Sequence, residues 1–425
     1  MKPIFNEQIQ MWSDLGFNIP IKEGYYWLDN GIIKAFTPDG QLHKLYKYKV
    51  NDDLTINITK YQDSNLIKNH IFETWEETVE RNSERLSALE NESLDLIRRV
   101  MNDYADYDMY ISTSTGKDSM VTLDLVHRVN PNVPVLFNNT SLDCADTYKM
   151  VKSHKDWIVT NPKEGFYQWV KRIKFIPTRF SRACCTLFKE GLADKYFKKL
   201  NNDKLIQFMG VRNDESAKRA DREDMTQSPK WNNDNWYACL PIRKWSEFDI
   251  WIYILKYSLE INPKYRKGYH RCGCAMACPY ATKYTWVLDK YWYPKMFDRW
   301  RNILKEFFIN TFQWTQKNCT MNEFVVKEWG GGIMRPEPTE EVINEFMEYK
   351  GITDRNIALQ YFNKTCCECG KNVRQNDVLA MNLKMNGRNT NKIYCKKCLM
   401  KELNMSKDEW DNNVVDFKAQ GCKLF

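Results

Sequence analysis

Between residues 107 and 211 the sequence alternates short apolar stretches with longer stretches of helical spacing. The apolar stretches are rich in β-branched and aromatic residues, and the first of them leads into a glycine-bearing turn. Strands that alternate with helices form βαβ units, whose strands run parallel in one sheet with right-handed crossovers. The sequence therefore predicts an α/β domain on a parallel sheet, with strands at 108–113, 133–139, 157–160 and 204–211.

The segments on either side of this domain have different patterns. Residues 24–60 alternate aromatic and β-branched residues around two glycine-bearing turns, which is typical of antiparallel hairpins. Residues 74–105 carry leucines and isoleucines at helical spacing, which predicts one long amphipathic helix. We expect four parts: a β-rich unit (1–72), the α/β domain (73–285), a helical extension (286–362) and a C-terminal cysteine module (363–425).

Composition excludes several classes of protein. Of the 425 residues 43% are hydrophobic, which is enough for packed cores, and residues 1–10 lack the pattern of a secretory signal. The longest apolar run, of about six residues at 250–255, is too short to cross a membrane. The formal charge of +8 suits a phosphate-bearing partner. We expect a cytoplasmic protein with no membrane partner.

The 14 cysteines gather in groups, whereas a disulfide framework would spread them along the chain. Such grouping indicates metal ligation in a reducing compartment. The groups are Cys184 and Cys185; Cys272, Cys274 and Cys278; and Cys366, Cys367, Cys369, Cys395 and Cys398.

The turn after the first expected strand spans Ser112 to Ser119 and reads STSTGKDS. A glycine there lets the backbone approach a phosphate, the following helix offers unpaired N–H groups, and Lys117 adds positive charge. The spacing is not that of a Walker A motif. The sequence favours an anion-binding loop; the alternative is an ordinary strand-to-helix turn with Ser114 or Asp118 near the helix cap.

Residues 114–119 resemble the S-G-G-K-D-S pyrophosphate loop of the ATP pyrophosphatases, with Thr115 in place of the first glycine. Three later segments, in order, resemble the phosphoadenosine phosphosulfate reductase family within that superfamily. They are 136–148, similar to F-x-D-T-G … T-Y; 210–219, similar to G-x-R-x-x-E-S … R; and 241–254, similar to P-L-x-x-W-x-x-x-D-V-W-x-Y-I. In the first of the three, Asn139 replaces the aspartate and Ser141 the glycine.

The resemblance implies a nucleotide α-hydrolase-like fold in which the loop at Lys117 holds phosphates and residues 139–142 lie beside the nucleoside. It assigns catalytic roles to Lys117, Asp118, Arg212 and Glu215. It assigns nucleotide binding to Ser112, Ser114, Thr115, Gly116, Ser119, Asn139, Thr140, Ser141 and Arg219. From the residues alone, two arginines can clamp anionic oxygens while a glutamate holds one arginine in place. The alternative for 214–222 is a solvated charged helix face.

Cys184 and Cys185 with Cys274 and Cys278 resemble the Cys-Cys … Cys-x-x-Cys ligands of iron–sulfur adenylyl-sulfate reductases, which implies a [4Fe–4S] cluster. Here the second pair has three intervening residues, and Cys272 is a substitute for either member. Zinc in the same cysteines and plain structural thiols are the alternatives.

The last group contains two Cys-x-x-Cys pairs, Cys366 with Cys369 and Cys395 with Cys398. Four thiolates at this spacing predict a structural zinc site on a zinc-ribbon-like module, and rubredoxin-type iron is the alternative. Lysines and arginines around the module suit either a nucleic-acid contact or simple solubility.

The resemblance leaves three functions open. The first is binding of Mg-ATP, adenylation of an acceptor with release of pyrophosphate, and sulfur insertion, as in DNA phosphorothioation sulfurtransferases, with a nucleic-acid acceptor and a sulfur-donor or reductant protein as partners. The second is a sulfonucleotide reductase that produces sulfite, which in the family needs a cysteine in a Glu-Cys-Gly-x-His tail; this chain carries Cys422 without that histidine. The third is a nucleotide-binding regulator without turnover. The Lys117-Asp118-Ser119 sequence favours the first.

Overall fold

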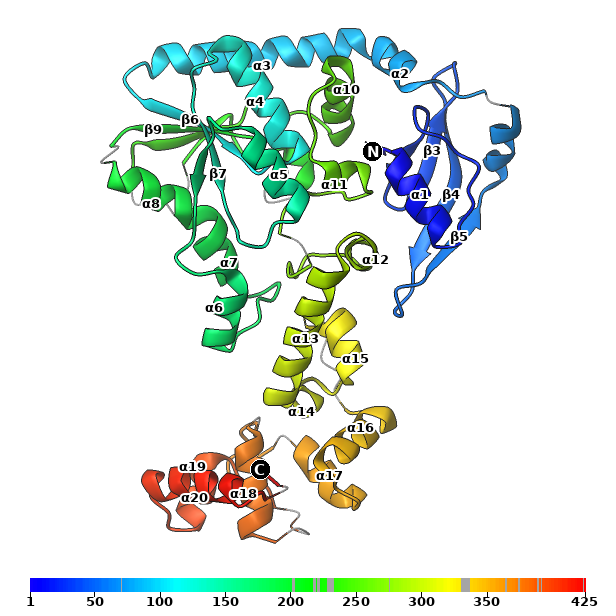
Figure 1. The fold of residues 1–425 in the computed structure, drawn as a ribbon. Coiled ribbons are helices and arrows are strands. Elements are labelled where there is room, and N and C mark those ends of the chain that lie inside the picture. The colour runs from blue at the N-terminus through cyan, green and yellow to red at the C-terminus, as the bar shows by residue number, and fades with distance from the viewer. Residues whose placement is uncertain are drawn as a thin grey trace. The chain divides into compact units, whose positions relative to one another are not determined.

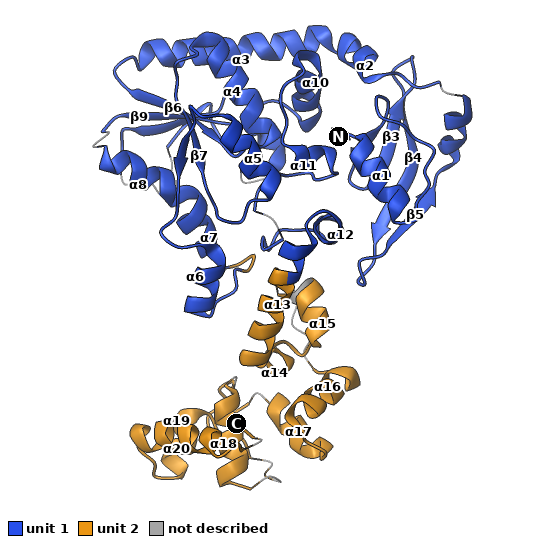
Figure 2. Cartoon of the chain, in the orientation of Figure 1, with its two compact units in different colours: residues 1–177, 181–298 blue, residues 178–180, 299–425 orange. Residues whose placement is uncertain are grey.

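The computed structural model describes residues 1–425 except 70, 201–202, 217–218, 220–221, 228–232, 275, 330–336, 364, 374, 388–389, 391 and 423. The chain divides into two compact units (Figure 2). The first contains residues 1–177 and 181–298, and the second contains 178–180 and 299–425. Within the described residues, no helix has both the length and the apolar character needed to span a bilayer. The division into four parts stays a prediction.

The first unit is built on a six-stranded sheet in the order β10-β11-β9-β6-β7-β8 (Figure 1). All neighbouring strands are parallel except β10, which pairs antiparallel with β11. The expected α/β fold with a parallel sheet is therefore confirmed. The strands are β6 (Asp108–Thr113), β7 (Val135–Asn138), β8 (Ile158–Thr160), β9 (Leu205–Met209), β10 (Met225–Thr226) and β11 (Trp236–Cys239).

Helices cover both faces of this sheet, because alternate residues of each strand point to opposite sides. On one face Ile111, Phe137 and Phe208 pack in a core that includes Val121 and Trp251. On the other face a smaller core joins the strands to Phe197 of α8. The helices of the first face are α3 (Ser83–Asp103), α4 (Lys117–Val129) and α10 (Glu247–Tyr257), and that of the second is α8 (Gly191–Lys199).

The order of the strands creates a switch point beside β6. The chain proceeds from β6 to β7 and β8 on one side and then returns to place β9 on the other side. In open parallel sheets, ligands bind outside the carboxyl ends of the strands at such a point. The loop 114–116 after β6 and the segment 210–212 after β9 therefore lie next to each other at the edge where a ligand is expected.

The long helix expected at 74–105 is two helices, α2 (Trp75–Arg81) and α3. They meet at Asn82, whose side-chain amide donates to the carbonyl of Thr78 at 2.8 Å. This bond satisfies a carbonyl at the end of α2, so the helix ends there and a new one begins.

The N-terminal hairpins form a separate antiparallel sheet in the order β1 to β5, as the alternating pattern predicts. Asn30 and Gly31 both have positive φ, as a two-residue hairpin turn of this hand requires. Trp27 contacts Phe248 of α10, and Gln8 donates to the hydroxyl of Tyr284 in α12, so this sheet packs within the first unit. The elements are β1 (Lys2–Pro3), α1 (Asn6–Asp14), β2 (Trp27–Asp29), β3 (Ile32–Phe36), β4 (Leu42–Val50), β5 (Ile56–Lys60) and η1 (Gln62–Asn69).

The remaining elements of the first unit connect these layers. They are α5 (Ala145–Ser153), α6 (Phe166–Ile173), α7 (Ala183–Cys185), η2 (Thr186–Glu190), η3 (Asn213–Glu215), α11 (Pro263–Arg266) and α12 (Lys283–Trp292). The helix α13 (Pro294–Asn310) begins in the first unit and continues in the second. The described elements of the second unit that follow are α14 (Gln313–Lys317), α15 (Met321–Glu323), η4 (Phe324–Glu328), α16 (Glu340–Lys350), α17 (Arg355–Phe362), α18 (Asn376–Met385), α19 (Lys396–Glu402) and α20 (Lys407–Ala419).

Replacing Gly210 by alanine is expected to destabilise the first unit by about 1–3 kcal/mol. A Cβ at this position would lie 2.6 Å from the carbonyl carbon and oxygen of Asp118 and 2.7 Å from the nitrogen of Ser119, so backbone has to move. Urea unfolding followed by tryptophan fluorescence measures the change. Gly165→Ala is the matched control, because its nearest atom would be 3.7 Å away. Equal losses in the two variants would refute the close approach.

Candidate nucleotide and thiol sites

The loop after β6 is closed on itself by Ser119. The hydroxyl of Ser119 donates to the carbonyl of Gly116 at 2.9 Å and accepts from the N–H of Ser114 at 3.2 Å. Gly116 is the N-cap of α4, so the N–H groups of the first helical turn have no partner within the helix, and that of Lys117 donates to the hydroxyl of Tyr265. Ser112 lies half-buried on β6, between its register partners on β7 and β9. This is the geometry that the motif predicts for an anion-binding turn.

Thr115 has a φ of 56°, in the left-handed region. The position is the one where the family pattern has glycine, and a β-branched residue there is strained by about 1–2 kcal/mol. The Thr115 side chain is completely buried, and its hydroxyl accepts a hydrogen bond from Asn262 at 2.8 Å. Thr115 thus adopts a backbone conformation that glycine reaches without strain.

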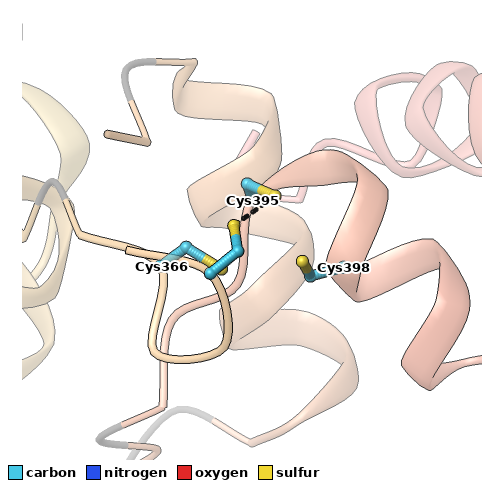
Figure 3. A group of neighbouring side chains, drawn as sticks. Cys366, Cys395 and Cys398 are labelled. Carbon is cyan, nitrogen blue, oxygen red and sulfur yellow. Dashed lines mark hydrogen bonds between the residues drawn. The ribbon is translucent and has the colours of Figure 1, made fainter. Parts of the chain in front are cut away.

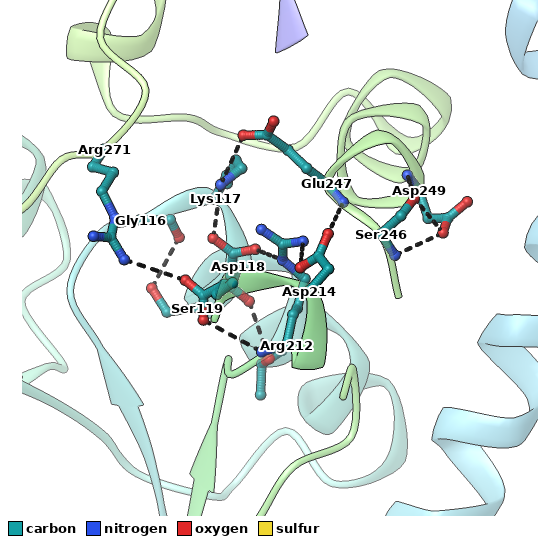
Figure 4. A network of polar contacts seen from close by, with 12 residues as sticks. Gly116, Lys117, Asp118, Ser119, Arg212, Asp214, Ser246, Glu247, Asp249 and Arg271 are labelled. Atoms are coloured by element: carbon teal, nitrogen blue, oxygen red, sulfur yellow. Dashed lines mark hydrogen bonds and ion pairs between the residues drawn. The ribbon is translucent and has the colours of Figure 1, made fainter. Parts of the chain in front are cut away.

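Lys117 and Asp118 begin α4 and make a network of charges (Figure 4). The ammonium of Lys117 is 4% exposed and lies 2.9 Å from Asp118 and 3.5 Å from Glu247. Asp118 also accepts from the Nε of Arg212. Burial opposes ionisation of Asp118, but the charges of Lys117 and Arg212 outweigh it and lower the pKa of its carboxyl. Glu247 likewise has its pKa lowered to about 2, since Lys117 and the Met1 amino group outweigh its burial.

Two further carboxylates arrange the arginines at the end of β9. Arg212 is 4% exposed and donates to Asp214. Glu215 pairs with Arg219 and, at 3.4 Å, with Arg271. Burial, followed by the charges of Arg222 and Arg271, lowers the pKa of Arg219. Since arginine stays ionised, this crowding of positive charge favours the approach of an anion.

The segment after β7 folds into a tight turn held by Asn139. Its side-chain oxygen accepts from the N–H of Ser141 at 2.8 Å and from the hydroxyl of Tyr148 at 2.9 Å. Thr140 donates to Asp143 at 2.7 Å. Ser141 has a φ of 57°, again where the family pattern has glycine, and its hydroxyl accepts from the N–H of Phe166. An asparagine oxygen therefore accepts the bonds available to an aspartate, and the turn keeps its shape.

Four residues of this site have no local sequence signal. Asn262 and Tyr265 contact the loop from a segment more than a hundred residues away, as Tyr265 accepts from the N–H of Lys117 at 2.9 Å. Glu247 pairs with Lys117, which is also more than a hundred residues away, and Arg271 pairs with Glu215, 56 residues away. In the sequence, Glu247 lies inside the 241–254 segment that matched the family, which was the one available indication.

The thiols of Cys184, Cys185, Cys274 and Cys278 interact electrostatically. The pKa of Cys184 is raised by its hydrogen bond with Cys185, by burial, and by the charges of Cys185, Cys274 and Cys278. Burial, Cys278, Asp143 and Cys185 raise the pKa of Cys274 to about 12, although Lys189 opposes them. Negative charge on one of these thiols disfavours ionisation of the others, and a bound cation would offset this repulsion, so the donor set fits a metal or iron–sulfur group. A cube of four irons also holds its thiolates farther apart than a single ion does.

Cys272 lies in different surroundings. Its pKa is raised to about 12 by burial, against the opposing influence of Lys264, Tyr265 and Lys117. The carbonyl of Cys272 accepts from Lys264 at 3.4 Å. Cys272 therefore neighbours Lys264 and Tyr265, whereas Cys274 neighbours Cys278 and Cys185.

The thiol site adjoins the nucleotide site. The amide of Asn138, at the end of β7, donates to the carbonyl of Lys189 in the helical segment that carries Cys184 and Cys185. Arg271, which precedes Cys274, pairs with Glu215. Both cysteine segments are therefore tied to the carboxyl edge of the parallel sheet.

The second unit contains a compact four-cysteine group, Cys366, Cys369, Cys395 and Cys398 (Figure 3). Their sulfur atoms all lie within 4.8 Å of one another, and Cys369 and Cys395 are 3.7 Å apart. A tetrahedral zinc ion with Zn–S bonds of about 2.3 Å requires sulfurs about 3.8 Å apart, so the geometry fits zinc. Among the described residues, no other group of three or more potential ligands is this compact.

The scaffold of this group is a turn and a helix. Cys366 and Cys369 lie in a turn closed by the bond from Gly370 N–H to the Cys366 carbonyl and by a bridge between Thr365 and Asn372. Cys395 is the N-cap of α19. Burial opposes ionisation of Cys366, but N–H groups of Cys395 and Cys369 outweigh it and lower its pKa. These donors favour the thiolate that a metal needs.

Comparison with known proteins found a matching domain model and several similar proteins. Residues 108–279 match the model of the phosphoadenosine phosphosulfate reductase domain. An uncharacterized protein of Methanocaldococcus jannaschii is 31% identical over 255 residues, 58% of this chain and 60% of that protein. The adenosine 5'-phosphosulfate reductase of Halalkalibacterium halodurans is 25% identical over 193 residues, 43% of this chain and 79% of that protein. A crystal structure of phosphoadenylyl-sulfate reductase from Candida auris with phosphate covers 45% of this chain and 94% of its own, at 17% identity and a TM-score of 0.35.

The fold is an α/β domain on a parallel sheet, and the candidate site lies at the strand switch point. Residues 108–279 are similar to the phosphoadenosine phosphosulfate reductase domain. The bacterial relative is named as a reductase of adenosine 5'-phosphosulfate, the archaeal relative is uncharacterized, and the chain spans 60% of the archaeal relative's length.

Replacing Cys274 by serine is expected to remove most of the iron from anaerobically purified protein, as is joint replacement of Cys184 and Cys185. Iron per chain and visible absorption measure the effect. Cys272→Ser is the control, since this thiol contacts Lys264 and Tyr265 instead, and it is expected to keep its iron. Loss of iron from the control alone would place Cys272 in the cluster.

Replacing Cys369 by serine is expected to lower bound zinc to well below one ion per chain while iron stays. Elemental analysis after dialysis measures both metals. Cys367→Ser is the control, because Cys367 is exposed and adjacent to Cys366 but outside the four-sulfur group. A retained zinc in Cys369→Ser would contradict the tetrahedral site.

Proposed function

We propose that the protein binds Mg-ATP at the loop of Lys117, adenylates an acceptor with release of pyrophosphate, and inserts sulfur into that acceptor, a nucleic acid. The observation that carries the proposal is the loop itself. A helix N-terminus, a buried ammonium and three crowded arginines converge at the strand switch point, beside a four-thiol site.

The chemistry assigned to these groups is electrostatic. An acceptor oxygen attacks the α-phosphorus, the bond to the β-phosphate oxygen breaks, and pyrophosphate leaves with that electron pair. Lys117, Arg212 and the N–H groups of the loop stabilise the charge that develops on the leaving group. Reduced sulfur, as hydrosulfide, then displaces AMP together with the acceptor oxygen. Arg212 already pairs with the nearby carboxylates of Asp118 and Asp214. Magnesium is therefore expected to bind the phosphate oxygens of ATP and not these carboxylates.

Cluster-bound sulfur chemistry is proposed for the four thiols. Cys184, Cys185, Cys274 and Cys278 would hold a [4Fe–4S] group, which supplies a place to bind or relay sulfur when present. The chain's contribution is to keep these thiols at the same sheet edge as the phosphates, through the Asn138 and Arg271 contacts.

Retained geometry argues against the regulator without turnover. Thr115 and Ser141 replace glycines, yet both adopt the positive φ that glycine allows. Asn139 replaces an aspartate, yet its oxygen accepts two hydrogen bonds. Lys117 and Arg212 remain in place. These substitutions therefore support a working site with altered packing.

A nucleic-acid acceptor is supported by charge. Lys171, Arg172, Lys174, Arg182 and Lys189 are exposed around the Cys184–Cys185 pair. Tyr280, two residues after Cys278, is 49% exposed and carries the guanidinium of Arg182 over its ring at 5.4 Å. Exposed aromatic and arginine side chains are the usual surface for unpaired bases.

The sulfonucleotide reductase is the second candidate, favoured by the relatives named adenosine 5'-phosphosulfate reductase. That reaction requires a cysteine that reaches the substrate. Here Cys422 lies in a segment whose Leu424 carbonyl accepts from Tyr361 at 3.1 Å and from Lys350 at 3.4 Å. These two hydrogen bonds hold the segment of Cys422 in place, which supports the ATP-dependent function over the reductase.

Calorimetry on anaerobically purified protein tests the choice, with Mg-ATP compared against phosphoadenosine phosphosulfate and adenylyl sulfate at one salt concentration. We expect tighter binding of Mg-ATP, and a loss of about tenfold or more in Lys117→Met, which removes one buried charge from the phosphates. Lys195→Met, an exposed lysine on α8, is the control. Tight sulfonucleotide binding with weak ATP binding would establish the reductase instead. Unchanged affinity in Lys117→Met would remove the loop assignment.

A further inference from the structure

Thr115 needs a partner to hold its backbone. A residue at positive φ has steric strain that glycine lacks, and the strain is largest for a β-branched side chain. Thr115 at 56° leads directly into Gly116 and the first turn of α4, so its φ sets the path of the whole loop.

The partner in the structure is Asn262. Asn262 is completely buried, and its amide nitrogen donates to the hydroxyl of Thr115 at 2.8 Å and to that of Thr147 at 2.9 Å. Its oxygen accepts from the N–H of Lys264 at 3.0 Å, which caps α11. Each polar atom of this amide therefore has a partner, and a buried amide in such surroundings has one orientation.

Tyr265 gives the same segment a second contact with the loop. Its hydroxyl accepts from the N–H of Lys117, two residues beyond Thr115. Tyr265 is itself buried, so residues 262–265 contact the loop at two points with side chains that cannot move independently.

We infer that Asn262 is a positioning residue for phosphate binding: its hydrogen bond to Thr115 replaces the conformational freedom of the missing glycine and keeps the loop open to the anion. The inference rests on the proposed function in taking the loop as the phosphate site. It predicts that replacing Asn262 weakens phosphate binding only when residue 115 has a side chain.

A double-mutant cycle tests this. Asn262→Ser keeps a good helix cap but is too short to reach Thr115. We expect this change to weaken Mg-ATP and inorganic pyrophosphate binding about tenfold in the Thr115 protein, and less than about twofold when added to Thr115→Gly. The midpoint of thermal unfolding is expected to fall in both backgrounds, because the Thr147 bond is lost in both. An equal loss of affinity in the two backgrounds would make Asn262 merely structural.

Thr115→Val provides a second comparison that does not depend on any Asn262 variant folding. Valine keeps the strain and loses the hydroxyl, whereas glycine loses both. We expect Thr115→Val to bind pyrophosphate at least about fivefold more weakly than Thr115→Gly. Equal losses would mean that the hydroxyl contacts the ligand directly, which would overturn the inference.

Amide hydrogen exchange across residues 115–119 separates the inference from the proposed function, because it needs no ligand. Exchange is expected to rise with Asn262→Ser in the Thr115 background and to stay level in the glycine background. If the wild-type protein binds neither Mg-ATP nor pyrophosphate, the proposed function fails, and the exchange result still decides the role of Asn262. Equal rises in both backgrounds would contradict that role.

Discussion

The ion pair between Asp118 and Arg212 joins the start of α4 to the end of β9, and the nucleotide site depends on it. The two residues meet because the chain crosses from one side of β6 to the other, and because Gly210 leaves room for the backbone of Asp118. Both side chains are nearly buried, so removal of either leaves a charge without a partner, which is costly. The positions of Lys117, Asp214 and the outer arginines all follow from this pair.

The sequence predicted those parts of the molecule whose structure depends on residues close together in the chain. The strands, the glycine-bearing turn after the first strand and the compact group of the two Cys-x-x-Cys pairs depend on patterns within about ten residues, and the structure contains each of them. The break at Asn82 was missed because helical spacing continues across it, while a single side-chain bond to Thr78 ends the first helix. Helix propensity contains no information about such a side-chain hydrogen bond.

The contacts that complete the site could not be predicted from sequence. Asn262, Tyr265 and Arg271 act through hydrogen bonds to residues far away in the chain, and an isolated Asn or Tyr has many other uses in a protein. Sequence also left Cys272 and Cys274 equivalent. Although only two residues apart, these cysteines have different neighbours. Cys272 lies near Lys264, and Cys274 lies near the other thiols.

The left-handed Thr115 bears on how such a site changes over evolutionary time. A threonine at this left-handed position is costly unless a buried amide donates a hydrogen bond to its hydroxyl, so threonine at 115 depends on asparagine at 262. Replacing Thr115 by glycine removes this dependence, whereas losing Asn262 first leaves the strained threonine without its partner. Sequence patterns that demand glycine in this loop will therefore overlook chains that have kept its shape by another route.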